Sequence, residues 1–279
     1  MKFTTAITTA ILATGAFAAP RPGLVERLQS RGVLSRQSAP ADKAGADHPL
    51  EEKGVLEKGG HDGAQVQYSN NWAGIVRENP PASATYTAVS ATFTVPNPTA
   101  TDNSGNMQAA SAWVGIDGDT YTNAILQTGV DCYIQDGQKS YDAWYEWFPN
   151  SAQNFDLDLT AGDVIVATVQ SSSPSEGVAM IENKSTGQKV TKSLSAPSST
   201  ATLGGQNAEW IVEDFNSGNA MVPLVNFGKV TFTGAQAEAD GEDYGVQSSA
   251  QVLDIQQNGK ILAKTTVLSD TEFSVAYSG

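Results

Sequence analysis

The sequence predicts an all-β domain over residues 67–279, and three observations support this. Segments such as "VSATFTVP" (89–96) and "GDVIVATVQSSS" (162–173) alternate apolar and polar residues with the period of a half-buried strand. Asn258-Gly259, between "QVLDIQQ" and "KILAKTTV", is a strong hairpin signal. From residue 67 onward we find no useful length of helical periodicity. Many short strands joined by polar turns favour an antiparallel sandwich or barrel of roughly 210 residues.

Residues 1–18 have the layout of a secretory signal peptide. A lysine at position 2 is followed by an apolar stretch and then by Ala16-Phe17-Ala18. The apolar stretch is too short to span a bilayer, and no later segment is long enough. We therefore expect cleavage after Ala18 and a secreted, extracellular protein that does not enter a membrane.

Residues 19–66 differ from the rest of the chain. They are rich in charge, lack aromatic residues, and contain both histidines, His48 and His61. Such a segment is either a disordered linker or a propeptide that is removed on activation. Because it lies between a signal peptide and a compact domain, we expect a propeptide, and hence a zymogen.

The charge of the chain limits its partners and its chemistry. The net charge of −14 argues against nucleic acid and anionic membranes as partners, and it suits a protein that works in acid. The domain after residue 66 contains no histidine. This excludes Ser-His-Asp and Cys-His catalysis and removes the commonest zinc ligand. "DGD" (117–119) is too short for a calcium loop, so we expect neither metal nor cofactor.

Two isolated residues raise smaller questions. Cys132 is the only cysteine, so no disulfide can form within the chain, and we expect a buried free thiol. Asn183 begins the sequon "NKS" and is a candidate for glycosylation.

Three stretches combine carboxylates with aromatic residues: 111–131, 140–150 and 207–215. In period-two alternation, one strand face carries Trp113 and Asp117, and the face with Gln127 carries small and aliphatic residues. The same alternation groups Asp142, Trp144 and Glu146 on one face, and Glu209, Ile211, Glu213 and Phe215 on another. Carboxylates alternating with aromatic rings predict a groove that suits an extended peptide or a sugar chain.

The chain resembles the glutamic peptidases, the eqolisin family of secreted fungal acid proteases. The resemblance is carried by "YSNNWAG", "SAWVGIDGDT", "AILQTGVD", "SYDAWYEWFP", "STGQKV" and "NAEWIVEDF", in order from residue 68 to about 232. It implies a sandwich of two antiparallel sheets of the concanavalin type, with a concave substrate groove. It also implies protein or peptide substrates, inhibition by the chain's own propeptide and a monomeric enzyme. The catalytic pair implied is Gln127 and Glu213, and the supporting residues implied are Trp72, Trp113, Asp117, Asp131 and Glu146.

The implied pair makes chemical sense in acid. A carboxylate of ordinary pKa can act as base and then as acid, whereas histidine would be fully protonated. We assign this cycle to Glu213. A neutral amide can stabilise an oxyanion at any pH, and we assign this role to Gln127, which can also hold the attacking water. Without the resemblance, an amide that satisfies a neighbouring strand would be the preferred interpretation of Gln127.

Two other functions fit parts of the pattern. A glycoside hydrolase could use Glu146 and Glu213 as its two acids, but it has no need of Gln127. A carbohydrate-binding module could use four tryptophans as stacking platforms, but it leaves the propeptide unexplained. These tryptophans are Trp72, Trp113, Trp144 and Trp147. A pepsin-like protease is set aside because two Asp-Thr/Ser-Gly motifs are lacking.

The chain departs from the family pattern at two places. The family's disulfides do not transfer, since "LGGQNAE" lacks a cysteine, and Phe148 stands where a tyrosine is common in the family.

Overall fold

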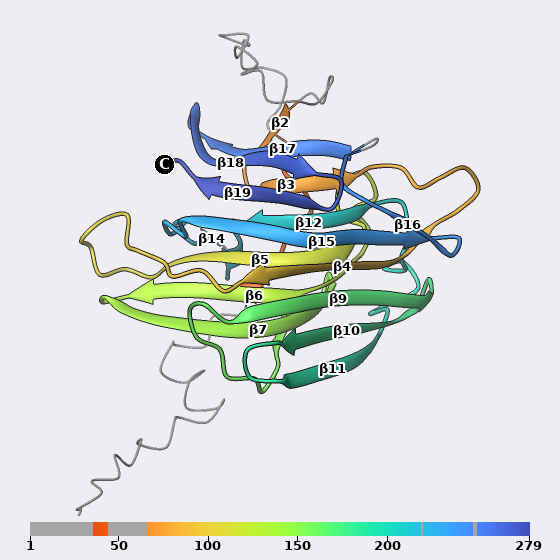
Figure 1. The fold of residues 1–279 in the computed structure, drawn as a ribbon, viewed down its shortest axis with the longest axis horizontal. Helices are drawn as coiled ribbons and strands as arrows, with labels where there is room; N and C mark the ends of the chain where they lie inside the picture. The colour runs from red at the N-terminus through yellow and green to blue at the C-terminus, as the bar shows by residue number, and fades with distance from the viewer. Residues whose placement is uncertain (1–35, 44–65, 219, 248–249) are drawn as a thin grey trace, which may run out of the picture. The chain divides into compact units, whose positions relative to one another are not determined.

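The structure, a computed structural model, describes residues 36–43, 66–218, 220–247 and 250–279, which belong to one compact unit, Leu34–Gly279 (Figure 1). Among these residues the regular secondary structure is β throughout, and no helix of membrane-spanning length and apolarity occurs. The strands, in chain order, are β1 (Arg36–Gln37), β2 (Val66–Ser69), β3 (Trp72–Arg77), β4 (Tyr86–Thr94), β5 (Gln108–Ile116), β6 (Ile125–Gln135), β7 (Gln138–Phe148), β8 (Gln153–Asn154), β9 (Val164–Ser173), β10 (Glu176–Asn183), β11 (Gln188–Ser195), β12 (Ala208–Glu213), β13 (Asn216–Ser217), β14 (Ala220–Met221), β15 (Lys229–Ala239), β16 (Glu242–Tyr244), β17 (Ala250–Gln257), β18 (Lys260–Ser269) and β19 (Glu272–Tyr277).

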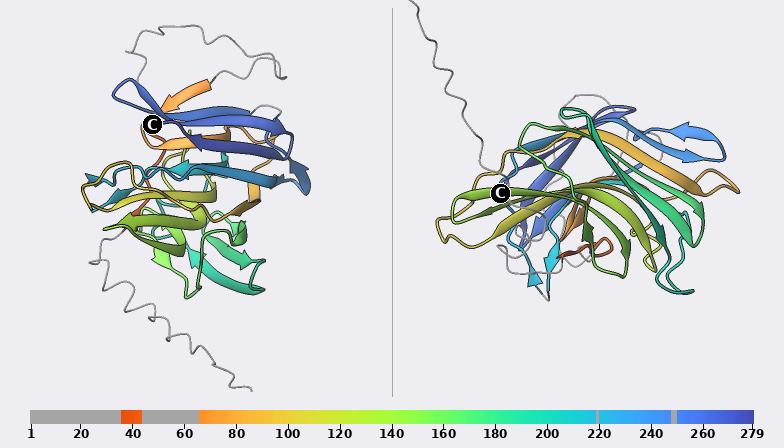
Figure 2. Two further views of the ribbon diagram at one scale, coloured as in Figure 1. Left: turned by 60° about the vertical axis from the view of Figure 1, so that its left-hand side comes forward. Right: turned by 90° about the horizontal axis from the view of Figure 1, so that it is seen from below.

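The strands form two layers. Their hydrogen-bonded order is β11-β10-β9-β4-β15-β19-β18-β17-β3-β12-β5-β6-β7-β8, and this ladder folds back on itself (Figure 2). Strands β9 and β10 pack on β5 and β6, while β4 and β15 pack on β12. Strands β19, β18 and β17 carry the ladder from one layer to the other. The predicted all-β sandwich of antiparallel sheets is confirmed, with a small separate sheet of β1, β13 and β14.

The main hydrophobic core lies between the layers. Phe232 and Phe273 of one layer stack with ring centroids 4.8 Å apart. Trp147 and Trp210 of the other layer are buried, and each indole N–H donates to a backbone carbonyl. Buried indoles with satisfied N–H groups keep their hydrophobic stabilisation without an unpaired donor. Trp147 is therefore a core residue and not a surface stacking platform.

The predicted local elements are present. Residues 89–96 contribute to β4 and residues 162–173 to β9, and each strand alternates between buried and less buried positions. Asn258 and Gly259 both have positive φ, 52° and 75°, between β17 and β18. Positive φ at both central residues is the geometry of a type I′ hairpin turn, which the Asn-Gly pair favours.

Strands β5, β6 and β12 are buried on both faces. One face of each packs into the core between the layers. The opposite face carries a second apolar cluster. Its fully buried residues are Trp72, Val76, Trp113, Ile125, Trp144, Ile211 and Leu253. We call this second surface, on β3, β12, β5, β6 and β7, the site face, because the predicted functional residues lie on it.

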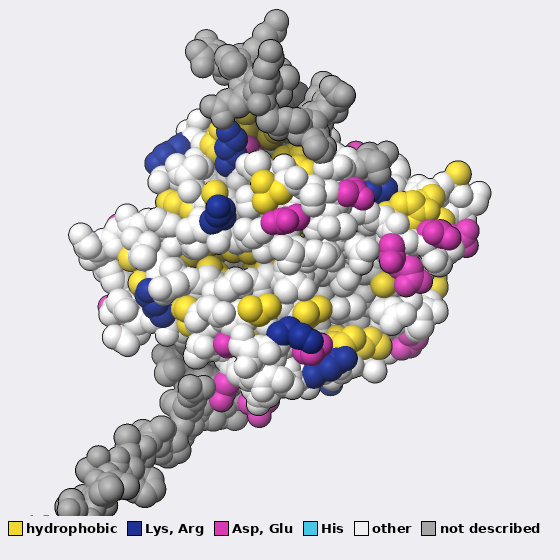
Figure 3. All heavy atoms as spheres, viewed as in Figure 1, with side chains coloured by type: hydrophobic (Ala, Val, Ile, Leu, Met, Phe, Trp, Pro, Cys, Tyr) yellow, Lys and Arg dark blue, Asp and Glu magenta, His cyan; other side chains and the backbone are white. Residues whose placement is uncertain are grey.

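The outer surface carries both signs of charge (Figure 3). Acidic side chains gather over the ends of β15 and β16, where Glu238, Asp240, Glu242 and Asp243 lie. Exposed carboxylates of this kind keep an acidic protein soluble and carry no information on catalysis.

Candidate active site

The register of four neighbouring strands places the predicted acids and amide in two rows on the site face. Glu213 of β12 pairs with Ser111 of β5, which pairs with Asp131 of β6. Cross-strand partners share a face of the sheet, so these three side chains lie in one row. The second row contains Gln127 of β6 opposite Glu146 of β7.

The second row extends over β5 to one more acid. Gln127 is paired with Gly115, and Gly115 is paired with Glu209 of β12. Gly115 leaves room for an indole, because a Cβ on this glycine would lie 2.8 Å from an atom of the Trp113 ring. The aromatic residues and the acids therefore share one surface, as the period-two pattern predicted.

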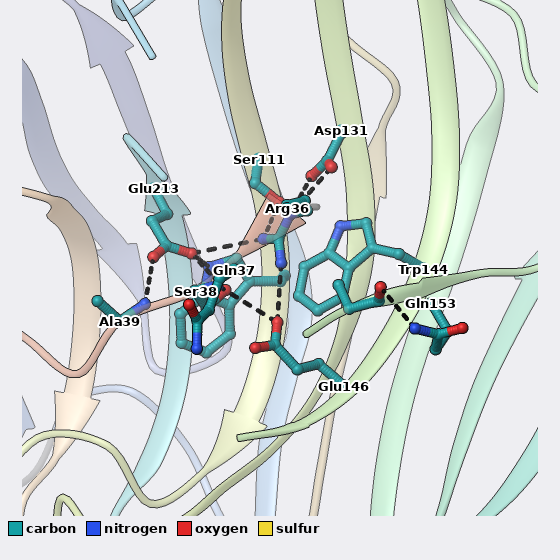
Figure 4. A network of polar contacts seen from close by, with 12 residues as sticks. Arg36, Gln37, Ser38, Ala39, Ser111, Asp131, Trp144, Glu146, Gln153 and Glu213 are labelled. Carbon is teal, nitrogen blue, oxygen red and sulfur yellow. Dashed lines mark hydrogen bonds and ion pairs between the residues drawn. The ribbon is translucent and has the colours of Figure 1, made fainter. Parts of the chain in front are cut away.

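Residues 36–43 lie across this surface and fill its centre (Figure 4). The Arg36 guanidinium stacks over the Trp144 ring at 3.6 Å from the centroid. Its Nε lies 2.9 Å from Oδ2 of Asp131, and its Nη1 lies 3.0 Å from Oε2 of Glu146. Its Nη2 donates to Ser111 Oγ and lies 3.5 Å from Oε2 of Glu213. One cation therefore contacts three carboxyl groups in a buried setting.

The backbone that follows Arg36 reaches the Glu213 carboxyl group. The Ala39 N–H donates to Oε1 of Glu213 at 3.2 Å, and the Ser38 hydroxyl donates to Oε2 at 2.8 Å. The Trp113 indole N–H donates to the same Oε2 at 3.0 Å. Glu213 thus contacts a peptide N–H directly, and the indole fixes its orientation.

Two of the acids that contact Arg36, Glu213 and Glu146, have raised pKa values. Burial raises the pKa of Glu213, although Arg36 and the hydrogen bond from Ser38 lower it. Burial raises the pKa of Glu146 to about 8. The Arg36 charge lowers this pKa, and the negative charge of Glu213 raises it further. Desolvation favours the neutral form of a carboxyl group. Of these two acids, Glu146 is therefore the one that we expect to be protonated first as the pH falls.

Gln127 is fully buried, and neither its Nε2 nor its Oε1 has a hydrogen-bond partner in the part of the chain that the structure describes. A buried primary amide without partners costs about 1–3 kcal/mol of stability per unsatisfied group. Unpaired buried groups of this kind are uncommon in native structures and call for an explanation. Among the described residues, Gln127 forms no hydrogen bond to a neighbouring strand.

The remaining predicted site residues have different surroundings. Trp72 contacts Trp113 edge to face, with centroids 5.0 Å apart, and so supports the indole that orients Glu213. Asp131 also accepts a hydrogen bond from the Tyr133 hydroxyl at 2.7 Å. Asp117 instead accepts four backbone N–H groups from residues 204–207, and its φ is 68°. Asp117 therefore organises a loop, and its hydrogen bonds go to residues 204–207 and not to Arg36 or Glu213.

The two isolated candidates lie outside the site. Cys132 is buried, and burial raises the pKa of its thiol to about 12, so it is inert as a nucleophile. Asn183 is also buried, and its Nδ2 donates to Asp163 at 3.0 Å. A glycan would be attached to this nitrogen. The folded domain buries this nitrogen, and glycosylation of Asn183 stays a prediction.

Two features of the site were not singled out in the sequence. Glu209 is fully buried, both of its carboxyl oxygens lack partners among the described residues, and burial raises its pKa well above the ordinary value. Period-two alternation had placed it on the face of Glu213, which was the available signal. The role of Arg36, Ser38 and Ala39 at the centre of the site had no signal beyond the basic charge of their segment.

Comparison with known proteins gives a consistent set of relatives. A family model described as the Peptidase A4 family matches residues 70–277. Aspergillopepsin-2 of Aspergillus niger is 43% identical over 293 residues, covering 97% of this chain and 98% of that protein. Scytalidopepsin B of Scytalidium lignicola is 37% identical over 287 residues, covering 99% of this chain and all of that protein.

Solved structures agree with these matches. A crystal structure of scytalido-glutamic peptidase with a transition state analog inhibitor has a TM-score of 0.67 and 38% identity, covering 75% of this chain and 98% of that chain. The crystal structure of aspergilloglutamic peptidase from Aspergillus niger has a TM-score of 0.58 and 49% identity, covering 61% of this chain and 99% of that chain.

Proposed function

The chain belongs to the Peptidase A4 family of glutamic peptidases and is a protease, and we propose that it is a secreted acid endopeptidase that uses Gln127 and Glu213. One observation carries the proposal. The Glu213 carboxyl group accepts the N–H of Ala39 from a peptide segment that lies across the site face. A peptide substrate in the same position would present the nitrogen of its scissile bond to this acid.

Glu213 has the contacts that general acid–base catalysis requires. As a carboxylate it takes a proton from the attacking water, and as a carboxylic acid it gives that proton to the leaving amine. The nitrogen that would leave corresponds to the Ala39 nitrogen, 3.2 Å from Oε1. The Trp113 indole holds the other oxygen. One carboxyl group can therefore serve both steps in turn.

Gln127 supplies a neutral donor on the same face. When water attacks the scissile carbonyl carbon, negative charge develops on the carbonyl oxygen, and an amide N–H stabilises it without itself titrating. The free Nε2 and Oε1 of Gln127 support this role, because both are available to the reacting groups. Gln127 would donate to the oxyanion and hold the attacking water for Glu213.

The N-terminal region supports synthesis as an inactive precursor. Residues 1–18 would direct secretion, residues 19–66 would be the propeptide, and residues 67–279 would form the active, monomeric enzyme. The curated relatives are matched over nearly their whole length and nearly the whole of this chain, whereas the scytalido-glutamic peptidase structure matches 75% of this chain. Residues 36–43 occupy the site face and would exclude substrate until they are removed.

Purified full-length protein, after exposure to acid, is expected to cleave a denatured protein substrate between about pH 2 and 5, the range in which a carboxyl group cycles between acid and base. Pepstatin should not inhibit it, because the sequence lacks two Asp-Thr/Ser-Gly motifs. Gel electrophoresis and mass spectrometry of the products test this. Absence of cleavage from a preparation that has lost residues 1–66 would contradict the proposal.

Acid would release the inhibitory segment because of the charges around Arg36. Burial raises the pKa of Glu146 and of Glu213, and the charge of Arg36, which forms ion pairs with both, acts against that rise by favouring the ionised carboxylates. A ligand that lowers the pKa of an acid binds the ionised acid better, so its binding weakens as the pH falls and protons compete. Residues 36–43 would therefore be held near neutral pH and released in acid.

Arg36→Met is expected to raise the pH midpoint of precursor activation by roughly one pH unit, because the opposite charge that held the carboxylates ionised is lost. Incubation over a pH series, followed by intact-mass analysis, gives the midpoint. Gln37→Met is the matched control, since the Gln37 side chain donates to the Pro149 carbonyl in an exposed position and, among the described residues, contacts none of the site acids. Equal midpoints for Arg36→Met and wild type would refute the role of Arg36.

A further inference from the structure

Glu78 and Asp119 form a second pair of acidic residues, which contacts residues 36–43 at Lys43. Lys43 Nζ lies 3.0 Å from Oε1 of Glu78 and 2.9 Å from Oδ2 of Asp119. Glu78 directly follows β3, and Asp119 lies in the loop after β5. The mechanism proposed above uses neither acid. The pair therefore needs an explanation of its own.

The segment between Ala39 and Lys43 is held mainly through its backbone. The Ala41 N–H donates to the Gly118 carbonyl at 3.0 Å, and the Asn70 N–H donates to the Asp42 carbonyl at 2.8 Å. Asn71 accepts the Asp42 N–H and donates to the carbonyls of residues 39 and 40. Backbone contacts of this kind hold a peptide of almost any sequence in an extended conformation.

The two loops that carry the acids are joined by a side chain that does not belong to residues 36–43. The Asn207 side chain donates through Nδ2 to the Glu78 carbonyl at 3.0 Å. Its Oδ1 accepts the backbone N–H groups of residues 119, 120 and 121 at 2.9–3.1 Å. One buried amide thus joins both loops. A ligand that binds between Glu78 and Asp119 pays little of the entropy of ordering them.

Asp119 is suited to a cation. Its side chain is buried, and its Oδ1 has no hydrogen-bond partner among the residues that the structure describes. Burial raises the pKa of Asp119, the hydrogen bond from Lys43 lowers it, and the negative charge of Glu78 raises it. A buried carboxylate beside another acid is stabilised by a cationic partner. Lys43 supplies that partner from a segment that would leave on activation.

We infer that Glu78 and Asp119 form a substrate subsite for a basic side chain. The subsite would take a Lys or Arg located four residues after the residue whose N–H contacts Glu213, as Lys43 follows Ala39. This rests on the proposed function, because it treats residues 36–43 as occupying the path of a substrate. The protease would then prefer peptides with a basic residue at that spacing beyond the cleaved bond.

Two fluorogenic peptides test the subsite. Both copy residues 36–43 with Ser38→Ala, which removes the hydroxyl on Glu213, and the second also has Lys43→Met. The enzyme is full-length protein activated in acid, with loss of residues 36–43 verified by intact mass. At about pH 5, the upper end of the expected range of activity, where the fewest carboxyl groups are protonated, the lysine peptide should have roughly tenfold higher kcat/KM, which corresponds to about 1.4 kcal/mol.

Enzyme variants make the test specific. With Glu78→Gln and Asp119→Asn combined, the ratio of kcat/KM for the two peptides should fall to about one, because a neutral pair no longer favours a cation. Asp240→Asn, in the exposed turn between β15 and β16, is the matched control and should keep the tenfold ratio. Equal kcat/KM for both peptides on the wild-type enzyme, or an unchanged ratio in the double variant, would overturn the subsite.

The proposed function and the subsite fail in different ways. If the activated protein cleaves neither these peptides nor a denatured protein, the proposed function is contradicted. In that case binding alone tests the subsite. Fluorescence anisotropy measures the dissociation constants of the two peptides on the activated wild-type protein, and these should differ by the same factor. Equal dissociation constants would overturn it.

Discussion

Glu213→Gln is expected to reduce proteolysis to near background, with a loss of roughly 10²–10⁴-fold in kcat. Glutamine keeps the size of the side chain, and its one carbonyl oxygen can still accept either the Trp113 indole N–H or the peptide N–H, which contact different oxygens of Glu213. It cannot take a proton from water or return one to the leaving amine. Because no cavity and no unpaired charge is created, the fold should survive. Steady-state kinetics at saturating substrate and circular dichroism give the two readouts.

Asp214→Asn is the control for this result. Asp214 is the neighbouring acid in the chain, and its Oδ2 accepts a hydrogen bond from Gln257 at 2.8 Å. It lies one residue beyond β12, and its backbone N–H donates to the Asn71 carbonyl at 2.8 Å. The Asp214→Asn variant should keep kcat within a few-fold of the wild-type value. Retention of most activity by Glu213→Gln, or an essential Asp214, would refute the mechanism and the assigned face of β12.

The arrangement of this site could be predicted from the sequence because it depends on local alternation. The pattern of residues 207–215 placed Glu209 and Glu213 on one face, and the pairing of β12 with β5 agrees with it. The same reasoning grouped Trp144 with Glu146 on β7. Alternation is dictated by the pleat of a strand, so it survives whatever the strand packs against. Identification of Gln127 as functional required the family resemblance, since an amide in a strand has no distinctive pattern.

Contacts between distant segments could not be predicted in this way. Arg36 is 177 residues from Glu213 in the chain, and its own neighbourhood shows only charged residues and short apolar pieces separated by Gly and Pro. The sequence also did not determine which face of β7 packs into the core. Trp147 was therefore a candidate stacking platform until the packing of the two layers placed it in the core. Asp117 was associated with the pair through the resemblance, but its position at the end of β5 directs its side chain to the loop at 204–207.

The domain should be most stable in acid and should lose stability as the pH rises, because several carboxyl groups are buried. Burial raises the pKa of Asp254 to about 6, of Asp214 to about 7 and of Glu146 to about 8. A carboxyl group whose pKa is raised in the folded state favours the protonated protein. Its contribution is full below the unfolded-state pKa of about 4 and is lost as the pH rises through the folded-state pKa. The free energy of unfolding should therefore fall between about pH 4 and pH 8.

Asp214→Asn tests this with one side chain. Asparagine cannot ionise, so the variant avoids the burial of a carboxylate at pH 8, where wild-type Asp214 is forced to carry charge. We expect its free energy of unfolding at pH 8 to exceed that of wild type by roughly 1–3 kcal/mol, because each unit of pKa shift corresponds to about 1.4 kcal/mol and the new amide N–H lacks a partner. At pH 4 the acid is already neutral, and the advantage should disappear. Urea unfolding at both pH values measures the difference, with the exposed Asp240→Asn expected to stay within about 0.5 kcal/mol of wild type at each. A wild-type stability that is level from pH 4 to pH 8, or an equal effect of Asp214→Asn at both, would show that these buried acids do not set the acid preference of the fold.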